Sequence, residues 1–409
     1  MTTVNQNEAR VGNGLLIVML CCLGAVCEGF DLQVPGVSAP VLRGVFEMQP
    51  SQLGMFLSMS TFAMMLGAPL GGIASDVVGR KWVLIASIVV YSLLTIATVL
   101  ATDINTLYAL RFAAGIGLGG ALPNLVAIAV ESVAPARRSL AVGVMLAGPG
   151  IGGSLASYIA SVTATPDQWQ IIYYAGGLGP LLLVAPLLAL LLPNVRRAAT
   201  DNTASAGNAM SVLFGERRTL NTLAVWLGLL SILLVLFVLM SWLPTLLVER
   251  GLTREQALLV QMVVNLSAVP GSVLAGGALD AILKRRLLLA LALVYAGAMA
   301  AIALLATGPG VMSVMMAGGA LAGLLVIGGQ TALYALAPMV YPVWGRATGV
   351  GFGVAAGRIG SAGGPLVTGY LVAFGLTAPQ VLLSLLPVAA VAAGAALFLA
   401  SGEMKRSDG

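Results

Sequence analysis

Long apolar runs alternate with short polar segments along the whole chain. A helix that crosses a bilayer needs about 20 consecutive, mostly apolar residues, and these runs reach that length. The spacing predicts twelve spanning helices, over residues 14–42, 52–75, 82–102, 107–130, 140–163, 169–192, 220–247, 257–279, 287–307, 311–340, 347–372 and 381–400. We therefore expect an all-α membrane protein with twelve transmembrane helices.

Composition narrows the range of functions. Of 409 residues, 59% are hydrophobic and 9% are charged, whereas soluble proteins carry about 25% charged residues. A water-soluble enzyme is thereby excluded. The chain has no histidine, which excludes histidine-based catalysis, metal sites and proton relays. Cys21, Cys22 and Cys27 lie together in the first run and read as small buried apolar residues. We expect no enzyme activity, no cofactor and no metal site.

The basic residues predict the orientation in the membrane. Of the twenty lysines and arginines, fifteen fall on the side of the N-terminus, three on the opposite side and two within spans. Because basic loops stay on the cytoplasmic side, we expect both termini in the cytoplasm. The net charge of +5 then reflects orientation and does not indicate nucleic-acid binding.

The chain also contains an internal repeat. Residues after the second span recur after the eighth at an offset of 204, and residues after the fourth span recur after the tenth at an offset of 208. The matching residues are Gly72, Asp76, Arg80 and Lys81 with Gly276, Asp280, Lys284 and Arg285, and Arg138, Gly143 and Gly152 with Arg346, Gly351 and Gly360. This predicts an N-terminal six-helix bundle over 1–192, a cytoplasmic linker over 193–219 and a C-terminal six-helix bundle over 220–409. Parallel six-helix halves are a transporter architecture; a structural bundle without transport is the alternative.

Four charged residues lie inside the predicted spans: Glu28 and Asp31 in the first, Arg111 in the fourth and Arg358 in the eleventh. Each costs about 2.5–3.5 kcal/mol at the centre of a membrane helix, so each needs a partner or a watery cavity. Counting about 1.5 Å per residue places Asp31 and Arg111 at a similar depth. A carboxylate beside an arginine releases it when protonated, which would couple transport to protons. A static ion pair joining two helices is the alternative.

The remaining polar residues suggest where a substrate binds and where the gate lies. Arg358 lies near the midplane by the same count, and its guanidinium suits a carboxylate; a backbone carbonyl or the other half is the alternative partner. Asn124, Gln330 and Tyr334 lie mid-span and would hydrogen-bond either the substrate or a neighbouring helix. The loop residues expected to latch the halves, or else to be solvated surface charges, are Asp76, Arg80, Asp280 and Lys284.

Several of these segments resemble a known family. Gly72–Lys81 resembles the loop signature of the major facilitator superfamily, and Arg111–Gly115 resembles its span-four motif. Within it, the segments Glu28–Gln33 and Gly357–Gly360 resemble the aromatic acid:proton symporter family. Further similarity to its 3-(3-hydroxyphenyl)propionate transporters lies in Ala121–Leu125, Trp242–Glu249 and Gly328–Pro338.

The resemblance implies proton-coupled uptake of an aromatic carboxylate, such as 3-hydroxyphenylpropionate or a hydroxybenzoate, across a bacterial inner membrane. Proton coupling would involve Asp31, Glu28, Arg111 and Glu131. Substrate binding would involve Arg358, Arg111, Asn124, Gln330, Tyr334 and Trp242, with the ring against Tyr334 and Trp242. The expected partners are the substrate, protons and the lipid bilayer, with the protein acting as a monomer.

Two other functions stay open. The stretch Gly148–Gly153 resembles the span-five motif of drug:proton antiporters, so an efflux antiporter for organic compounds is the first. A membrane-embedded sensor that binds the acid without moving it is the second, although we expect no output domain in tails this short.

Val77 stands where the family loop usually has arginine, which puts the usual latch geometry in question.

Overall fold

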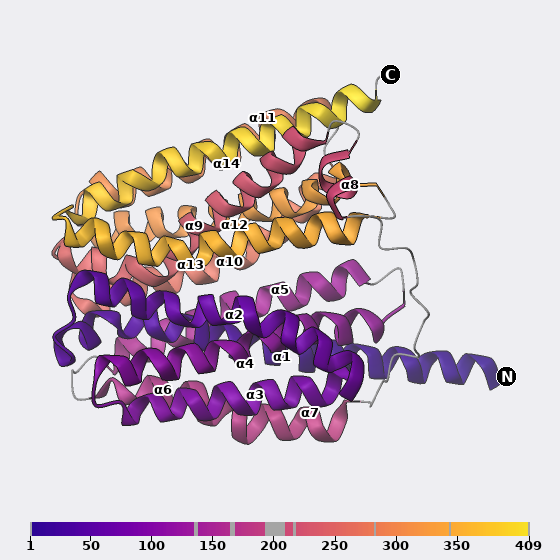
Figure 1. Ribbon diagram of the computed structural model, residues 1–409, viewed down its shortest axis with the longest axis horizontal. Coiled ribbons are helices and arrows are strands. Elements are labelled where there is room, and N and C mark those ends of the chain that lie inside the picture. Colours follow the sequence, from indigo (N-terminus) through magenta and orange to yellow (C-terminus); the bar gives the residue numbers. More distant parts are fainter. Residues whose placement is uncertain are drawn as a thin grey trace. The chain divides into compact units, whose positions relative to one another are not determined.

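The computed structural model describes residues 2–134, 138–163, 168–192, 209–215, 218–281, 284–342 and 345–407. Within these ranges every regular element is a helix (Figure 1). The chain divides into two compact units. The first unit comprises Met1–Met48 and Met59–Ala199, and the second comprises Gln49–Ser58 and Thr200–Gly409.

Six spans begin in the first half of the chain. Their elements are α1 (Thr2–Val45), α2 (Pro50–Val78), α3 (Arg80–Ala97) with η1 (Thr98–Leu100), α4 (Ile104–Glu131), α5 (Arg138–Val162), and a sixth span made of α6 (Gln170–Gly179), η4 (Pro180–Val184) and α7 (Ala185–Leu191). The single π-helical turn η4 begins at Pro180. Proline lacks the N–H that a regular helix would use, so a local change of hydrogen bonding is expected there.

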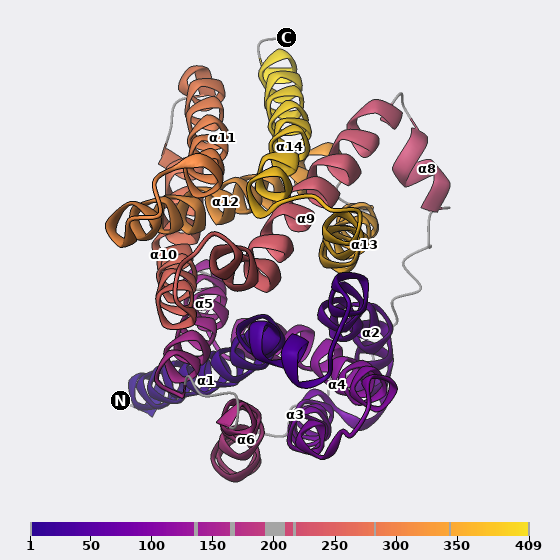
Figure 2. The same ribbon diagram turned by 90° about the vertical axis from the view of Figure 1, so that its left-hand side faces the viewer.

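The second half contains a short helix and six long ones. They are α8 (Ala209–Phe214), α9 (Thr219–Glu249), α10 (Arg254–Ala281), α11 (Lys284–Thr307), α12 (Met312–Val340), α13 (Arg346–Ala373) and α14 (Ala378–Ser407). The view in Figure 2 looks nearly along many of these helices and shows them side by side. Helix α8 falls inside the predicted linker, and the Thr222 hydroxyl of α9 donates to the Leu213 carbonyl oxygen at 2.6 Å.

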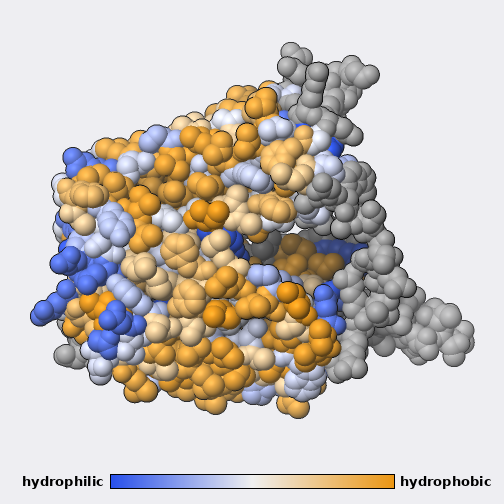
Figure 3. All heavy atoms as spheres, in the orientation of Figure 1, coloured by the Kyte–Doolittle hydropathy of each residue, from blue (hydrophilic) through white to orange (hydrophobic). Residues whose placement is uncertain are grey.

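All twelve predicted spans coincide with helices, which confirms the predicted fold class. By length and hydropathy alone, eleven helices of the described residues could cross a membrane, and α13 is the one that falls outside this set. Arg358 and many glycines lower the hydropathy of its 28 residues. Large apolar side chains such as Leu190 and Phe374 are 80% and 82% exposed, and the face in Figure 3 is mostly hydrophobic along the helices. Such a surface suits a lipid environment.

Two helix ends show how the local sequence sets the turns. Gly79 joins α2 to α3 with φ 99°, a conformation that favours glycine. Asp103 caps α4 by accepting hydrogen bonds from the backbone N–H groups of Asn105 and Thr106. The hydrogen bond from the Thr106 hydroxyl, together with these backbone bonds, holds the pKa of Asp103 below its ordinary value.

Glycines bring the helices of each unit close together, and the close crossings follow the internal repeat. A side chain at Gly152 of α5 would meet the Val26 carbonyl oxygen of α1, and one at Gly360 of α13 would meet that of Leu230 in α9. Two further crossings recur in the same way. They join Gly67 to Ile116 and Gly115 to Ser60 in the first unit, and Gly271 to Leu324 and Gly323 to Val264 in the second. The contact pairs differ by the offsets of 204 and 208 seen in the sequence, so the two units share one packing scheme.

This packing scheme predicts which glycines tolerate a methyl group. Gly152→Ala and Gly360→Ala should each destabilise the protein by about 1–3 kcal/mol, because the added atom meets backbone that cannot rotate away. Gly143 and Gly351 have open space at the Cβ position on the same two helices, so Gly143→Ala and Gly351→Ala should leave the melting temperature unchanged or raise it. Melting of the purified protein in detergent measures all four. Equal effects at crossing and open positions would contradict the scheme.

Candidate functional site

The expected ion pair between the first and fourth spans is present in the first unit. Arg111 Nη1 of α4 lies 3.6 Å from Asp31 Oδ2 of α1, and both side chains are fully enclosed. A charge withdrawn from water is tolerated only with a partner, and removing one member of a buried pair typically costs about 3–5 kcal/mol. Asp31 and Arg111 therefore stabilise one another, and a change in the charge of either alters the whole environment.

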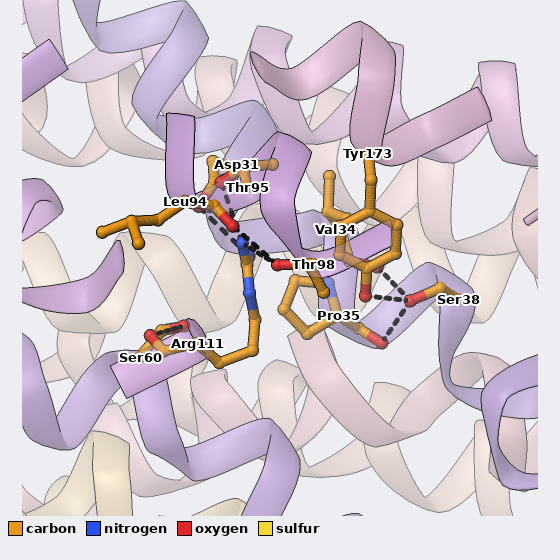
Figure 4. A network of polar contacts seen from close by, with 10 residues as sticks. All are labelled: Asp31, Val34, Pro35, Ser38, Ser60, Leu94, Thr95, Thr98, Arg111 and Tyr173. Carbon is orange, nitrogen blue, oxygen red and sulfur yellow. Dashed lines mark hydrogen bonds and ion pairs between the residues drawn. The ribbon is translucent and has the colours of Figure 1, made fainter. Parts of the chain in front are cut away.

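Two threonine hydroxyls complete the pair. Arg111 Nη2 donates to Thr95 Oγ1 of α3 and to Thr98 Oγ1 of η1, both at 2.9 Å. Thr95 Oγ1 in turn donates to Asp31 Oδ1 at 2.5 Å. Figure 4 shows Thr95 between the guanidinium and the carboxylate, with Thr98 at the other side of the guanidinium. Three helical segments, α1, α3 with η1, and α4, thus meet at one polar cluster.

Aromatic and hydroxyl groups surround the guanidinium. The Tyr173 ring of α6 lies 5.4 Å from Arg111 Cζ, within range of a cation–π interaction. The Tyr173 hydroxyl lies 3.0 Å from Ser38 Oγ, which also bonds the carbonyl oxygens of its own helix (Figure 4). On the other side, Ser60 Oγ of α2 donates to the Arg111 carbonyl oxygen at 3.0 Å. These contacts fix both the backbone and the head group of Arg111.

Glu28 lies on α1 close to this cluster. Its side chain is buried and precedes Asp31 by three residues, so the two carboxyls share one side of the helix. The Tyr91 ring of α3 is close to both carboxyls. The structure thus brings three of the four residues expected for proton coupling, Asp31, Glu28 and Arg111, into one region.

Glu131 does not join them. It lies at the C-terminal end of α4, twenty residues after Arg111 and so about 30 Å along the helix. There Arg80 Nη1 bonds Glu131 Oε1 at 2.7 Å, with the two side chains 17% and 43% exposed. Nearby, Lys81 Nζ donates to the Leu192 carbonyl oxygen at 2.7 Å. Glu131 therefore groups with the expected gating residue Arg80.

The other expected gating residues are placed less fully. Asp76 is exposed near the end of α2. Asp280 lies in α10 and Lys284 begins α11, but their side chains lie outside the described residues. A latch between the two loops therefore stays a prediction.

In the second unit, three expected substrate residues lie together. Tyr334 and Gln330 are one turn apart on α12, so their side chains lie on one side of that helix. The charge of Arg358 on α13 acts directly on Tyr334. All three are partly exposed. A cation, an amide and a phenol thus meet on adjacent helices, which is a chemically suitable set for a carboxylate with an aromatic ring.

Two other expected substrate residues have packing roles. Trp242 is fully buried, and its indole N–H donates to the Pro365 carbonyl oxygen at 3.0 Å, which joins α9 to α13. Asn124 is buried, and its amide donates to the Gly120 carbonyl oxygen of the same helix at 2.8 Å. The indole N–H of Trp242 and the amide N–H of Asn124 are thus each bonded within the protein. Mid-span polar residues look the same in sequence whether they line a cavity or hold helices together.

The sequence analysis missed Thr95, Thr98, Ser38 and Tyr173. One signal was available: Thr95 and Thr98 are three residues apart and therefore lie on one face of the helix near its end. Among the described residues, no cluster of three or more cysteine, aspartate or glutamate side chains is arranged to hold a metal ion.

Comparison with known proteins identifies the family. The family model described as Major Facilitator Superfamily matches residues 21–315. The chain is 36% identical to the 3-(3-hydroxy-phenyl)propionate transporter of Escherichia coli, over 99% of this chain and 97% of that protein. It is 33% identical to the gallate transporter of Pseudomonas putida, over 95% and 92% of the two chains. The crystal structure of a D-xylose-proton symporter shares the fold with a TM-score of 0.77 at 18% identity, covering 94% and 96%.

The geometry predicts strong energetic coupling within the pair. Asp31→Asn leaves a buried guanidinium without its counter-charge, and Arg111→Gln leaves the carboxylate without its cation; each should cost about 3–5 kcal/mol. The double variant Asp31→Asn with Arg111→Gln buries no unpaired charge and should melt above at least one single variant. A double-mutant cycle on melting temperature measures this, and strictly additive losses would contradict the pairing.

Proposed function

Because the chain belongs to the Major Facilitator Superfamily, we propose that it takes up an aromatic carboxylate, such as 3-hydroxyphenylpropionate or a hydroxybenzoate, together with protons. The enclosed Asp31–Arg111 pair is the observation that supports coupling of uptake to protons. The substrate class is supported by the names of the relatives, which include transporters of hydroxyphenylpropionate, gallate, 4-hydroxybenzoate and benzoate.

The proposed cycle starts with proton binding. A proton from outside binds Asp31, or Glu28 beside it, and neutralises a carboxylate. The substrate anion then pairs with Arg358 while Gln330 and Tyr334 face its polar groups and ring. Neutralised charges are cheaper to enclose than ionised ones, so the loaded protein can close around its cargo and open inward. The proton and the substrate leave on the more alkaline inner side.

We extend the proposal to topology and assembly. The repeat supports two six-helix halves, over 1–192 and 220–409, that move against each other around a linker over 193–219. The excess of basic residues in one set of loops supports cytoplasmic termini in a bacterial inner membrane. We propose that one copy, surrounded by lipid, carries out transport, with Arg80, Glu131, Asp76, Asp280 and Lys284 at the inner gate.

The efflux alternative rests on the stretch Gly148–Gly153. In the structure, Gly148 and Gly152 pack against the backbone of α1, which accounts for both small residues by close packing and does not indicate a direction of transport. The direction of movement under an inward proton gradient separates uptake from efflux.

Uptake into proteoliposomes tests the coupling. With an inward proton gradient, labelled 3-hydroxyphenylpropionate or one of a panel of gallate, benzoate and 4-hydroxybenzoate should accumulate above its outside concentration. Asp31→Asn should abolish accumulation but retain exchange of labelled for unlabelled substrate, because exchange requires no net proton movement. Concentrative uptake by Asp31→Asn at the wild-type level would contradict the assignment, and gradient-driven extrusion by the wild type would favour the antiporter.

A second experiment tests Arg358. Arg358→Ala should raise KM about 10- to 100-fold, since a hydrogen bond to a charged group contributes about 1.5–3 kcal/mol. Arg358→Lys keeps the charge without the two-pronged geometry and should fall between the wild type and Arg358→Ala. The uncharged amide of the same acid is the control ligand: it should compete weakly, and equally well in all three proteins. A KM that does not change in Arg358→Ala would remove this residue from the binding site.

A further inference from the structure

The hydrogen bonds around Thr95 have a fixed direction. Arginine only donates, so Thr95 Oγ1 must accept from Arg111 Nη2. A hydroxyl carries one hydrogen, and that of Thr95 goes to Asp31 Oδ1. With Asp31 ionised, the chain of donors therefore runs from Arg111 through Thr95 to Asp31.

Among the described residues, Thr98 binds only Arg111 and its own helix, and it makes no hydrogen bond to Asp31. It accepts from the same Nη2 atom, but its own hydrogen goes to the Leu94 carbonyl oxygen of its helix. The two hydrogens of Nη2 are thus both taken by threonines. Arg111 is anchored to α3 and η1 by bonds that do not depend on the charge of Asp31.

The two oxygens of Asp31 consequently differ. Oδ1 already accepts the hydrogen of the Thr95 hydroxyl. Oδ2 faces Arg111 Nη1 at 3.6 Å, and no described residue gives it a hydrogen bond. A proton on Oδ1 would displace the Thr95 hydrogen, whereas a proton on Oδ2 leaves the Thr95 bond in place.

We infer that Thr95 is a positioning residue for proton coupling, which directs the transported proton to Oδ2 of Asp31. This inference rests on the proposed function. The proton comes from the outer solution, forms an O–H bond with a lone pair of Oδ2 and later leaves from the same atom to the inner side. No proton leaves Thr95 or Arg111. Protonation removes the charge attraction to Nη1, while Thr95 and Thr98 keep Arg111 in place.

The titratable groups near Asp31 are compatible with a positioning role for Thr95. The titratable and charged groups around Asp31 include Cys27 and Glu28 on α1, Tyr91 on α3, Arg111 on α4 and Tyr173 on α6. Helix α5, which packs along α1, has Arg138 at its first position as its only charged residue. Of these groups, Arg111 is the one that donates to Thr95 and so sets the direction of its hydrogen bonds.

The pH dependence of uptake separates a positioning role from a structural one. Thr95→Val keeps the shape but removes the bond to Oδ1, so the carboxylate gains a proton more readily. Half-maximal uptake should move about one pH unit towards alkaline pH, a tenfold change in proton affinity. Thr95→Ser restores the hydroxyl and should restore the midpoint. Thr98→Val leaves the Thr95–Asp31 bond intact and should shift the midpoint by less than a third as much.

The ratio of accumulation to exchange adds a second readout. Thr95→Val should lower accumulation at a fixed gradient several-fold while exchange remains, because the proton then binds either oxygen. An unchanged midpoint and ratio in Thr95→Val, or equal shifts in Thr95→Val and Thr98→Val, would overturn the inference.

Failure of the proposed function is visible separately, as absence of proton-driven uptake by the wild type. In that case the melting temperature as a function of pH provides the test without any substrate. The part of that pH profile which Asp31→Asn abolishes should move towards alkaline pH in Thr95→Val and return in Thr95→Ser. A profile identical to that of the wild type would overturn the inference.

Discussion

The enclosed pair of Asp31 and Arg111 constrains the helices around it in the first unit. A carboxylate and a guanidinium removed from water must be held at a set distance, because each is costly without the other. Three helical segments supply the groups that hold them, and Ser60 of α2 fixes the backbone of Arg111. The crossing at Gly115 lets α4 approach α2 closely enough for that bond. Close packing and charge pairing therefore depend on one another.

The internal repeat preserves the packing but not the charges inside the spans. At the repeat offsets, Asp31 corresponds to Val235 and Arg111 to Gly319, whereas Arg358 corresponds to Gly150. The helix crossings are equivalent in both units, so duplication of the bundle did not require duplication of the chemistry. On the proposed function, the first unit handles the proton and the second unit supplies the cation for the substrate. Proton binding in the first unit and substrate binding in the second must then be coupled through a conformational change of the protein, rather than through one ion pair common to both sites.

The sequence was sufficient for the twelve spans, because apolar length decides them, and for the pair, because the rise per residue gives the depth of Asp31 and Arg111. It was insufficient for Thr95 and Thr98, since threonine is common in such helices and its partner depends on helix rotation. It did not reveal that Trp242 is buried and bonded to Pro365, because a buried aromatic and a cavity-lining one have the same local sequence. Glu131 was grouped with Asp31 by resemblance, although about 30 Å of helix separates it from Arg111.

The geometry of the pair also bears on how easily it can be broken. A two-pronged arginine–carboxylate contact at about 2.8 Å would bind both oxygens of Asp31, so a proton on either oxygen would then have to break a strong hydrogen bond. Here one oxygen is bound through Thr95 and the other lies 3.6 Å from Nη1. Protonation at that second oxygen removes a charge attraction and no hydrogen bond, while Nη2 keeps both of its threonine partners. Thr95 and Thr98 therefore keep two hydrogen bonds to the buried guanidinium in both charge states of Asp31, which favours a pair that must open and close in every cycle.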